Sequence, residues 1–104
     1  MSQDLGTPER IEVLWQTEQV RIERIVSTGQ SSPPGFWYDQ EEDEFVMLLQ
    51  GTAMLDFDGG RRQQMEAGDF LLIPAHEKHR IAATSFQPPC IWLCVFLVGK
   101  NEKV

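Results

Sequence analysis

The sequence has little of what several common classes of protein require. It carries nine Lys and Arg residues against sixteen Asp and Glu residues in 104, so its net charge is −7. Binding to nucleic acid or to an anionic membrane surface needs a basic stripe, and the isolated pair Arg61 and Arg62 does not make one. We therefore expect neither nucleic acid nor membrane as a partner.

Long apolar runs are also missing. No run approaches the roughly 20 residues that a membrane-spanning helix needs. The N-terminal segment, MSQDLGTPER, has neither the basic start nor the apolar stretch of a signal peptide. These absences predict a cytoplasmic location.

Cysteine is scarce, with only Cys90 and Cys94 in the chain. They are four residues apart in a segment that reads as a strand, which separates their Cα atoms by about 13 Å. A disulfide requires Cα atoms within about 7 Å of each other. We expect two reduced thiols that pack in the core as small apolar side chains.

The length and composition fit one domain. A chain of 104 residues with 41% apolar residues can form one core but not two. We expect a single domain over residues 1–104, with its core at about 10–98. The two tails, residues 1–9 and 99–104, are expected to be loose.

Short alternating segments separated by turn residues predict an all-β sandwich or barrel without a helix. In residues 20–27 a helix also fits the spacing of the apolar residues, and this alternative stays open at the level of sequence. Phe45, Met47, Phe70 and Trp92 are expected in the core. The predicted strands are 11–15, 20–27, 45–49, 52–57, 61–66, 70–73, 80–84 and 90–98.

The two histidines of the chain lie close together, directly after a short apolar strand that Pro74 ends. If a strand begins at His79, then His79, Ile81 and Ala83 share one face, and that face is apolar enough to point inward. The direction of His76 is not set by strand alternation, because His76 belongs to the preceding turn.

An acidic run, residues 39–44, precedes one of the buried strands. Most of this run reads as solvated loop, but Glu44 begins the apolar strand itself. A carboxylate in that position is costly unless it is paired or binds a cation. Carboxylate and imidazole together form the ligand set of Zn, Fe, Mn, Ni or Cu sites.

Two spacings in this part of the chain resemble the motifs of the cupin superfamily, in particular its small single-domain bacterial members. The pattern Gly68-x5-Pro74-x4-His79 is similar to the second cupin motif, and Glu44-x6-Gly51 is similar to the end of the first. The resemblance implies a double-stranded β-helix, or jelly roll, which is commonly a homodimer. It also implies that Glu44 and His79 are metal ligands.

The sequence departs from the family pattern where the first motif normally has two histidines. Those positions hold Trp37 and Asp39, while His76 stands where the second motif usually has Gly. We expect Asp39 and His76 to replace the missing ligands. The predicted site for a divalent transition metal is then Glu44, His76, His79 and Asp39.

Trp37 and Tyr38 have two readings. They pack in the core or rim of the barrel, or they form one wall of a pocket for a small-molecule ligand.

Three functions follow from these observations. The first is a metal-dependent enzyme of the dioxygenase, isomerase or decarboxylase type. The second is a non-catalytic cupin that binds or senses a small molecule with a degenerate metal site. The third is a metal-free lyase or isomerase in which Glu44 and His79 exchange protons with the substrate.

Overall fold

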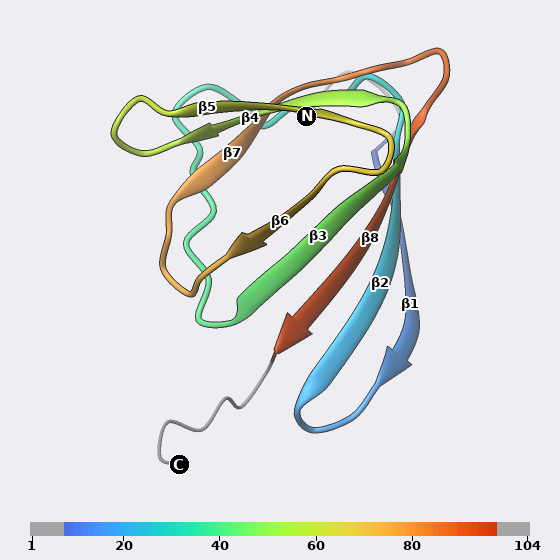
Figure 1. Ribbon diagram of the computed structural model, residues 1–104, viewed down its shortest axis with the longest axis vertical. Helices are drawn as coiled ribbons and strands as arrows, with labels where there is room; N and C mark the ends of the chain where they lie inside the picture. Colours follow the sequence, from blue (N-terminus) through green and yellow to red (C-terminus); the bar gives the residue numbers. More distant parts are fainter. Residues whose placement is uncertain (1–7, 98–104) are drawn as a thin grey trace.

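Residues 8–97, the part of the chain that the computed structural model describes, form eight antiparallel strands (Figure 1). The strands are β1 (Arg10–Gln16), β2 (Val20–Ser27), β3 (Asp43–Gln50), β4 (Thr52–Phe57), β5 (Arg62–Glu66), β6 (Phe70–Ile73), β7 (His79–Thr84) and β8 (Cys90–Leu97). Residues 20–27 are therefore a strand and not a helix. Among residues 8–97 no helix is long and apolar enough to cross a membrane.

The strands make two sheets that face each other. The larger sheet has the order β1-β2-β8-β3-β6, and the smaller has the order β5-β4-β7. Strands that are distant in sequence are neighbours, since β8 lies between β2 and β3 (Figure 1). This crossing arrangement confirms the predicted all-β jelly roll.

The core lies between the sheets and follows from strict alternation along the strands. In β8 every second side chain is buried, from Cys90 to Phe96, and β3 alternates in the same way from Glu44 to Leu48. Both cysteines are free and buried, as expected. The buried apolar residues are Val46, Leu48, Ala53, Leu55, Phe57, Met65, Ile73, Cys90, Trp92, Cys94 and Phe96.

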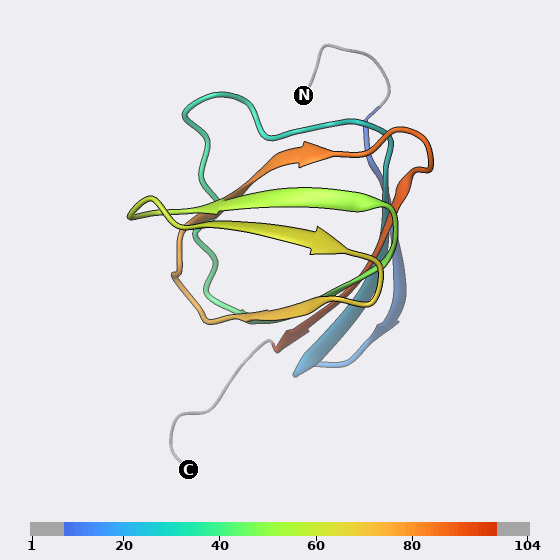
Figure 2. The same cartoon turned by 45° about the horizontal axis from the view of Figure 1, so that its top comes forward.

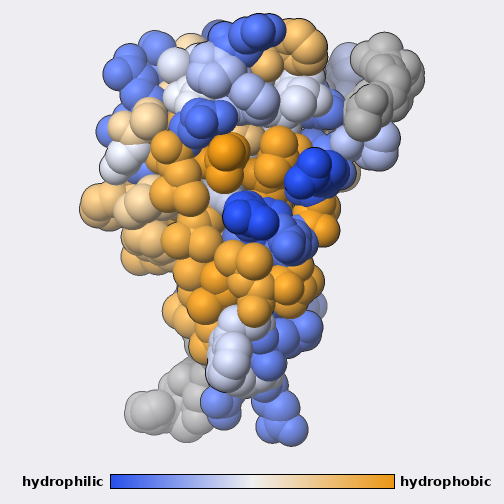
Figure 3. Space-filling model, turned by 90° about the vertical axis from the view of Figure 1, so that its right-hand side faces the viewer, coloured by the Kyte–Doolittle hydropathy of each residue, from blue (hydrophilic) through white to orange (hydrophobic). Residues whose placement is uncertain are grey.

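Three of the residues expected in the core face the other way. Phe45 and Met47 alternate with the buried residues of β3 and pair with Leu72 and Phe70 of β6, so all four lie on the outer face of the larger sheet. Phe70 is 60% exposed. Trp92, by contrast, is buried as predicted. Figure 3 shows that apolar side chains cover much of one side of the molecule.

The prediction that His79, Ile81 and Ala83 share one inward face of β7 is wrong for Ala83, because β7 contains a β-bulge. Leu55 of β4 pairs with Ile81, but the next residue of β4, Met54, pairs with Ala83, which leaves Ala82 as an extra residue. The bulge reverses the alternation after Ile81. His79 therefore points inward as expected, while Ala83 is exposed.

The connection between β2 and β3 covers the free edge of β7, and Figure 2 shows it running beside that strand. Ser32 N donates to Ile81 O at 2.8 Å, and Tyr38 N donates to His79 O at 2.7 Å. His79 N donates in return to Tyr38 O at 3.1 Å. These bonds fix the connection, at Ser32 and at Tyr38, against the open edge of the smaller sheet.

The predicted loose tails fall largely outside the described residues, which begin at Pro8 and end at Leu97. Glu9 is an exception to the prediction. Its carboxylate accepts a hydrogen bond from Ser27 Oγ at 2.5 Å, so this part of the N-terminal segment is held against β2.

Candidate functional site

A cavity of about 180 Å³ lies between the two sheets. Both sheets and the β2–β3 connection contribute to its wall, and most of the lining is apolar or aromatic. This is the usual composition of a small-molecule site. The lining residues are Glu9, Ile11, Glu23, Ile25, Tyr38, Gln40, Glu44, Val46, Leu55, Ile73, His79, Ile81, Trp92, Cys94 and Phe96.

Glu44 and His79 meet in this cavity. The sequence predicted the inward direction of His79 and placed both residues in one site. Glu44 lies at the start of β3 and is 8% exposed, and His79 begins β7 and is 4% exposed. The distance between His79 Nε2 and Glu44 Oε1 is 3.8 Å. A carboxyl and an imidazole thus share one small, largely dehydrated space.

The orientation of the His79 ring is set by its other nitrogen. Nδ1 lies 2.9 Å from the carbonyl oxygen of Glu77, and a carbonyl can only accept, so Nδ1 carries a proton. Tyr38 stacks on the ring, with centroids 5.3 Å apart. These contacts direct Nε2 toward Glu44 and the cavity.

The environment of Glu44 favours its neutral form. Burial raises the pKa of the Glu44 carboxyl above its usual value, and the opposing effects of His79 and of hydrogen bonds from Gln40 and Cys94 do not cancel it. Gln40 Nε2 donates to Glu44 Oε1 at 3.4 Å. A proton can therefore stay on Glu44 at a pH where an exposed glutamate has lost it.

Cys94 does not act as a nucleophile in this setting. Burial, followed by the carboxylate of Glu44, raises the pKa of its thiol far above the usual value. Since the thiolate is the reactive form, Cys94 stays inert. The structure assigns it a hydrogen-bonding role beside Glu44.

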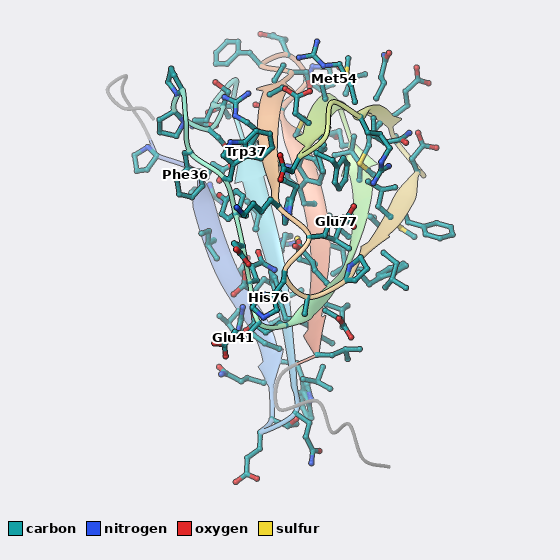
Figure 4. All side chains as sticks on the ribbon, turned by 90° about the vertical axis from the view of Figure 1, so that its left-hand side faces the viewer. Phe36, Trp37, Glu41, Met54, His76 and Glu77 are labelled. Carbon is teal, nitrogen blue, oxygen red and sulfur yellow. The ribbon has the colours of Figure 1, made fainter. Side chains whose placement is uncertain are left out.

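Asp39 and His76 form a second pair, outside the cavity. His76 Nδ1 lies 2.8 Å from Asp39 Oδ1, and the His76 side chain is 64% exposed. His76 adopts a φ of 66°, in the left-handed region that glycine usually occupies. Figure 4 shows its place in the turn that precedes β7, close to Glu41.

The four residues of the predicted metal site are thus split into two separate pairs. Among residues 8–97 no group of three or more His, Cys, Asp or Glu side chains is arranged to hold a metal ion. The cause is the left-handed turn at His76, which leaves that ring at the surface with Asp39. Glu44 and His79 alone are fewer than the three protein ligands typical of a catalytic metal site. The residues present therefore do not fit the metal that the family pattern implies.

The two aromatic residues predicted for a pocket wall differ in position. Tyr38 lines the cavity through its contact with His79, whereas Trp37 does not line it. Burial raises the pKa of the Tyr38 hydroxyl, and the carboxylates of Glu9 and Glu44 raise it further. Tyr38 therefore stays protonated and can donate a hydrogen bond.

Four polar residues of the cavity were not found from the sequence: Glu9, Glu23, Gln40 and Cys94. Glu23 and Cys94 are paired across β2 and β8, so they share one face. The inward face of β8 could have been assigned from the alternation of its apolar residues, but the pairing of β2 with β8 was needed to extend that assignment to Glu23.

The comparison with known families agrees with this architecture. The sequence profile of the cupin domain matches residues 23–96. The chain belongs to the cupin family. No curated protein matches it at a significant level.

Several solved structures share the fold of this cupin. One from Ralstonia eutropha JMP134, described as a candidate mannose-6-phosphate isomerase, is 41% identical, with a TM-score of 0.85 over 91% of this chain and 89% of that chain. A cupin superfamily protein from Desulfitobacterium hafniense DCB-2 is 23% identical, with a TM-score of 0.75 over 93% and 84% of the two chains.

An RmlC-like cupin from Shewanella frigidimarina NCIMB 400 is 17% identical, with a TM-score of 0.74 over 98% of this chain and 86% of that chain. At these lower identities the second and third similarities concern the fold alone.

Proposed function

We propose that this cupin takes a compact small molecule into the cavity between its sheets and that Glu44 and His79 act on it as acid and base. The observation that carries the proposal is the distance of 3.8 Å between His79 Nε2 and Glu44 Oε1 inside that cavity. Two proton-exchanging groups this close can reach neighbouring atoms of one substrate.

The roles follow from the surroundings of each group. Glu44 holds a proton because burial raises its pKa, so it serves as the acid that donates to a substrate oxygen. In the neutral form of His79 the ring proton is on Nδ1, which donates to the carbonyl of Glu77, so Nε2 is left to accept a proton. Nε2 serves as the base that removes a proton from carbon, and the two residues return to their starting states when the protons move back.

Such chemistry suits isomerisation or elimination at a carbon next to a carbonyl group. The proton leaves that carbon for His79 Nε2, while the carbonyl oxygen receives the proton of Glu44, which gives an enediol or enol. When the starting carbon carries a hydroxyl group, His79 returns the proton to the former carbonyl carbon while that hydroxyl gives its proton to Glu44, which completes an isomerisation and restores both residues. The similar protein from Ralstonia eutropha carries the name of an isomerase, which supports this reaction class for the present chain.

Hydrogen–deuterium exchange tests the proposal without requiring net turnover. The chain, treated with EDTA, is incubated in D2O with dihydroxyacetone, glyceraldehyde, aminoacetone and mannose 6-phosphate, and deuterium at the carbon next to the carbonyl is followed by NMR. We expect incorporation above the uncatalysed rate for at least one compound. Glu44→Gln and His79→Gln should each reduce the rate by about 100-fold or more.

The control and the competing functions give distinct outcomes. Glu41→Gln makes the same substitution at an exposed loop position and should leave the rate unchanged. Exchange that appears only after a divalent ion such as Zn²⁺ or Mn²⁺ is added would favour the metal-dependent enzyme. Absence of exchange with every compound would contradict the acid–base proposal and favour a binding or sensing cupin.

A further inference from the structure

Apart from His79, the ionisable groups of the described cavity lining include three carboxyl groups and no basic side chain. Glu9, Glu23 and Glu44 contribute to its lining, and within residues 8–97 no Lys or Arg does so. Each carboxylate comes from a different part of the fold, namely the segment before β1, the strand β2 and the start of β3. The acidity is therefore a property of the whole enclosure and not of one loop.

Two of these carboxylates are held in place by named partners. Glu9 accepts a hydrogen bond from Ser27 Oγ, which itself accepts one from the Trp92 indole at 3.1 Å. Glu23 accepts from Arg21 Nε at 2.7 Å. Arg21 Nη1 also donates to Glu42 at 3.0 Å, so the one guanidinium is shared by two carboxylates.

The rest of the wall is aromatic and aliphatic. Tyr38, Trp92 and Phe96 all line the cavity. The ring of Phe96 already has a cation above it, since the guanidinium carbon of Arg21 lies 4.3 Å from the ring centroid. Aromatic rings together with nearby carboxylates form the environment in which proteins bind organic cations.

We propose that the cavity selects a compact organic cation, an ammonium group on a small apolar body, and excludes phosphorylated compounds. This inference rests on the same cavity as the proposed function and names its substrate class. The ammonium group lies beside Glu9 and Glu23, while the reacting carbon and oxygen lie at Glu44 and His79. A phosphate group would instead face carboxylates, because no Lys or Arg of residues 8–97 lines the cavity and the adjacent guanidinium of Arg21 is already paired with Glu23 and Glu42.

The mutual influence of the carboxylates agrees with this assignment. Burial is the main cause of the raised pKa of Glu44 and of Cys94, and Glu23 adds to both. The charge of Glu23 therefore acts on Glu44 across the cavity and repels the carboxylate form of Glu44. A cation bound among them relieves that repulsion.

Choline and its uncharged isostere, 3,3-dimethyl-1-butanol, test the proposal directly because they differ only in the atom that carries the charge. Binding is followed through the indole N–H signals of the three tryptophans, of which only Trp92 lines the cavity. We expect choline to shift the signal of Trp92 and to leave those of Trp15 and Trp37 in place. Its dissociation constant should be at least about tenfold lower than that of the isostere.

Charge-neutralising variants identify the groups that are responsible. Glu9→Gln and Glu23→Gln should each weaken choline binding, whereas Glu18→Gln, an exposed position in the turn between β1 and β2, should not. Equal binding of the isostere, competition by inorganic phosphate, or no shift of Trp92 with choline would each overturn the inference. Choline binding in a chain without deuterium exchange would uphold the inference and contradict the acid–base function, so the two failures can be told apart.

Discussion

At the scale of single residues, the Ser27 hydroxyl connects the core to the candidate site. Ser27 is fully buried, receives a hydrogen bond from Trp92 Nε1 and donates one to Glu9. In Ser27→Ala the buried indole N–H loses its acceptor, which costs about 1–3 kcal/mol. We expect that reduction in the free energy of unfolding, measured by urea denaturation.

Ser31→Ala is the matched control, because Ser31 is exposed in the connection between β2 and β3. Its free energy of unfolding should stay within about 0.5 kcal/mol of the parent value. Equal stability of the two variants would show that the indole of Trp92 does not depend on Ser27.

Residues in strands and residues in loops differed in how well the sequence predicted them. His79 begins a strand, and its alternation with Ile81 correctly predicted that it points inward. Glu44 was identified differently, as a carboxylate at the start of an apolar strand and by the family resemblance, and the expected inward direction of Phe45 and Met47 would have placed it on the wrong face. His76 lies in a turn with a left-handed backbone, and Asp39 lies in a connection whose path depends on the edge of β7. The contacts that fix these two side chains come from distant segments, which local sequence patterns do not report.

At the scale of elements, the β3–β4 turn depends on the absence of a side chain at Gly51. This residue has a φ of +94°, and a Cβ there would lie 2.7 Å from Ser85 Oγ and 3.0 Å from Cys90 Cα. Gly51→Ala therefore combines backbone strain with a clash against the Ser85 side chain and a tight contact with the backbone of Cys90. We expect it to lower the free energy of unfolding by about 2–4 kcal/mol, measured by thermal and urea denaturation.

Gly59→Ala separates the two contributions. Gly59 has a φ of +97° in the hairpin between β4 and β5, but a Cβ there meets nothing within 4 Å. The free energy of unfolding of Gly59→Ala should fall by about 1 kcal/mol, from the strained backbone alone. If both variants lost the same amount, crowding at Gly51 would not contribute.

The elements themselves could be predicted closely because turn residues separate short alternating segments. The predicted strands 52–57 and 70–73 coincide with β4 and β6. The bulge at Ala82 could not be predicted, since it appears only when the register of β7 against β4 is known. The outward direction of Phe70 was missed for a related reason: an apolar strand does not show which of its faces is covered.

At the scale of the whole molecule, the outer face of the larger sheet exposes several large apolar side chains, and Figure 3 shows one side of the molecule that is largely apolar. Trp15 of β1 is 62% exposed and Leu72 of β6 is 66% exposed. Between these edges lies the ion pair of Arg24 and Glu12, which gives the face both signs of charge. Two copies related by a twofold axis can place each of these charges opposite its complement.

We therefore expect a homodimer through this face, in line with the family resemblance. Leu72→Lys should convert the dimer to a monomer, as measured by light scattering coupled to size-exclusion chromatography. Phe86→Lys is the control, because Phe86 is equally exposed, at 66%, but lies in the connection between β7 and β8. A parent chain with the mass of a monomer would contradict this expectation.

The central claim concerns the whole cavity: burial keeps a proton on Glu44 beside the Nε2 atom of His79 without the help of a metal. The most direct test is a pH titration of the Glu44 carboxyl carbon by NMR, in a chain treated with EDTA, with Glu44→Gln to assign the signal. We expect the midpoint above the ordinary glutamate value, because desolvation disfavours the carboxylate. The same raised pKa makes the folded state lose stability as the pH rises through that midpoint.

His79→Gln should move the midpoint further upward, since the imidazole of His79, whenever it is protonated, opposes the effect of burial. A midpoint at or below the ordinary glutamate value would contradict the account. So would a signal that titrates normally in EDTA and disappears when one equivalent of Zn²⁺ is added, because Glu44 would then be a metal ligand and not the acid of a proton-transfer pair.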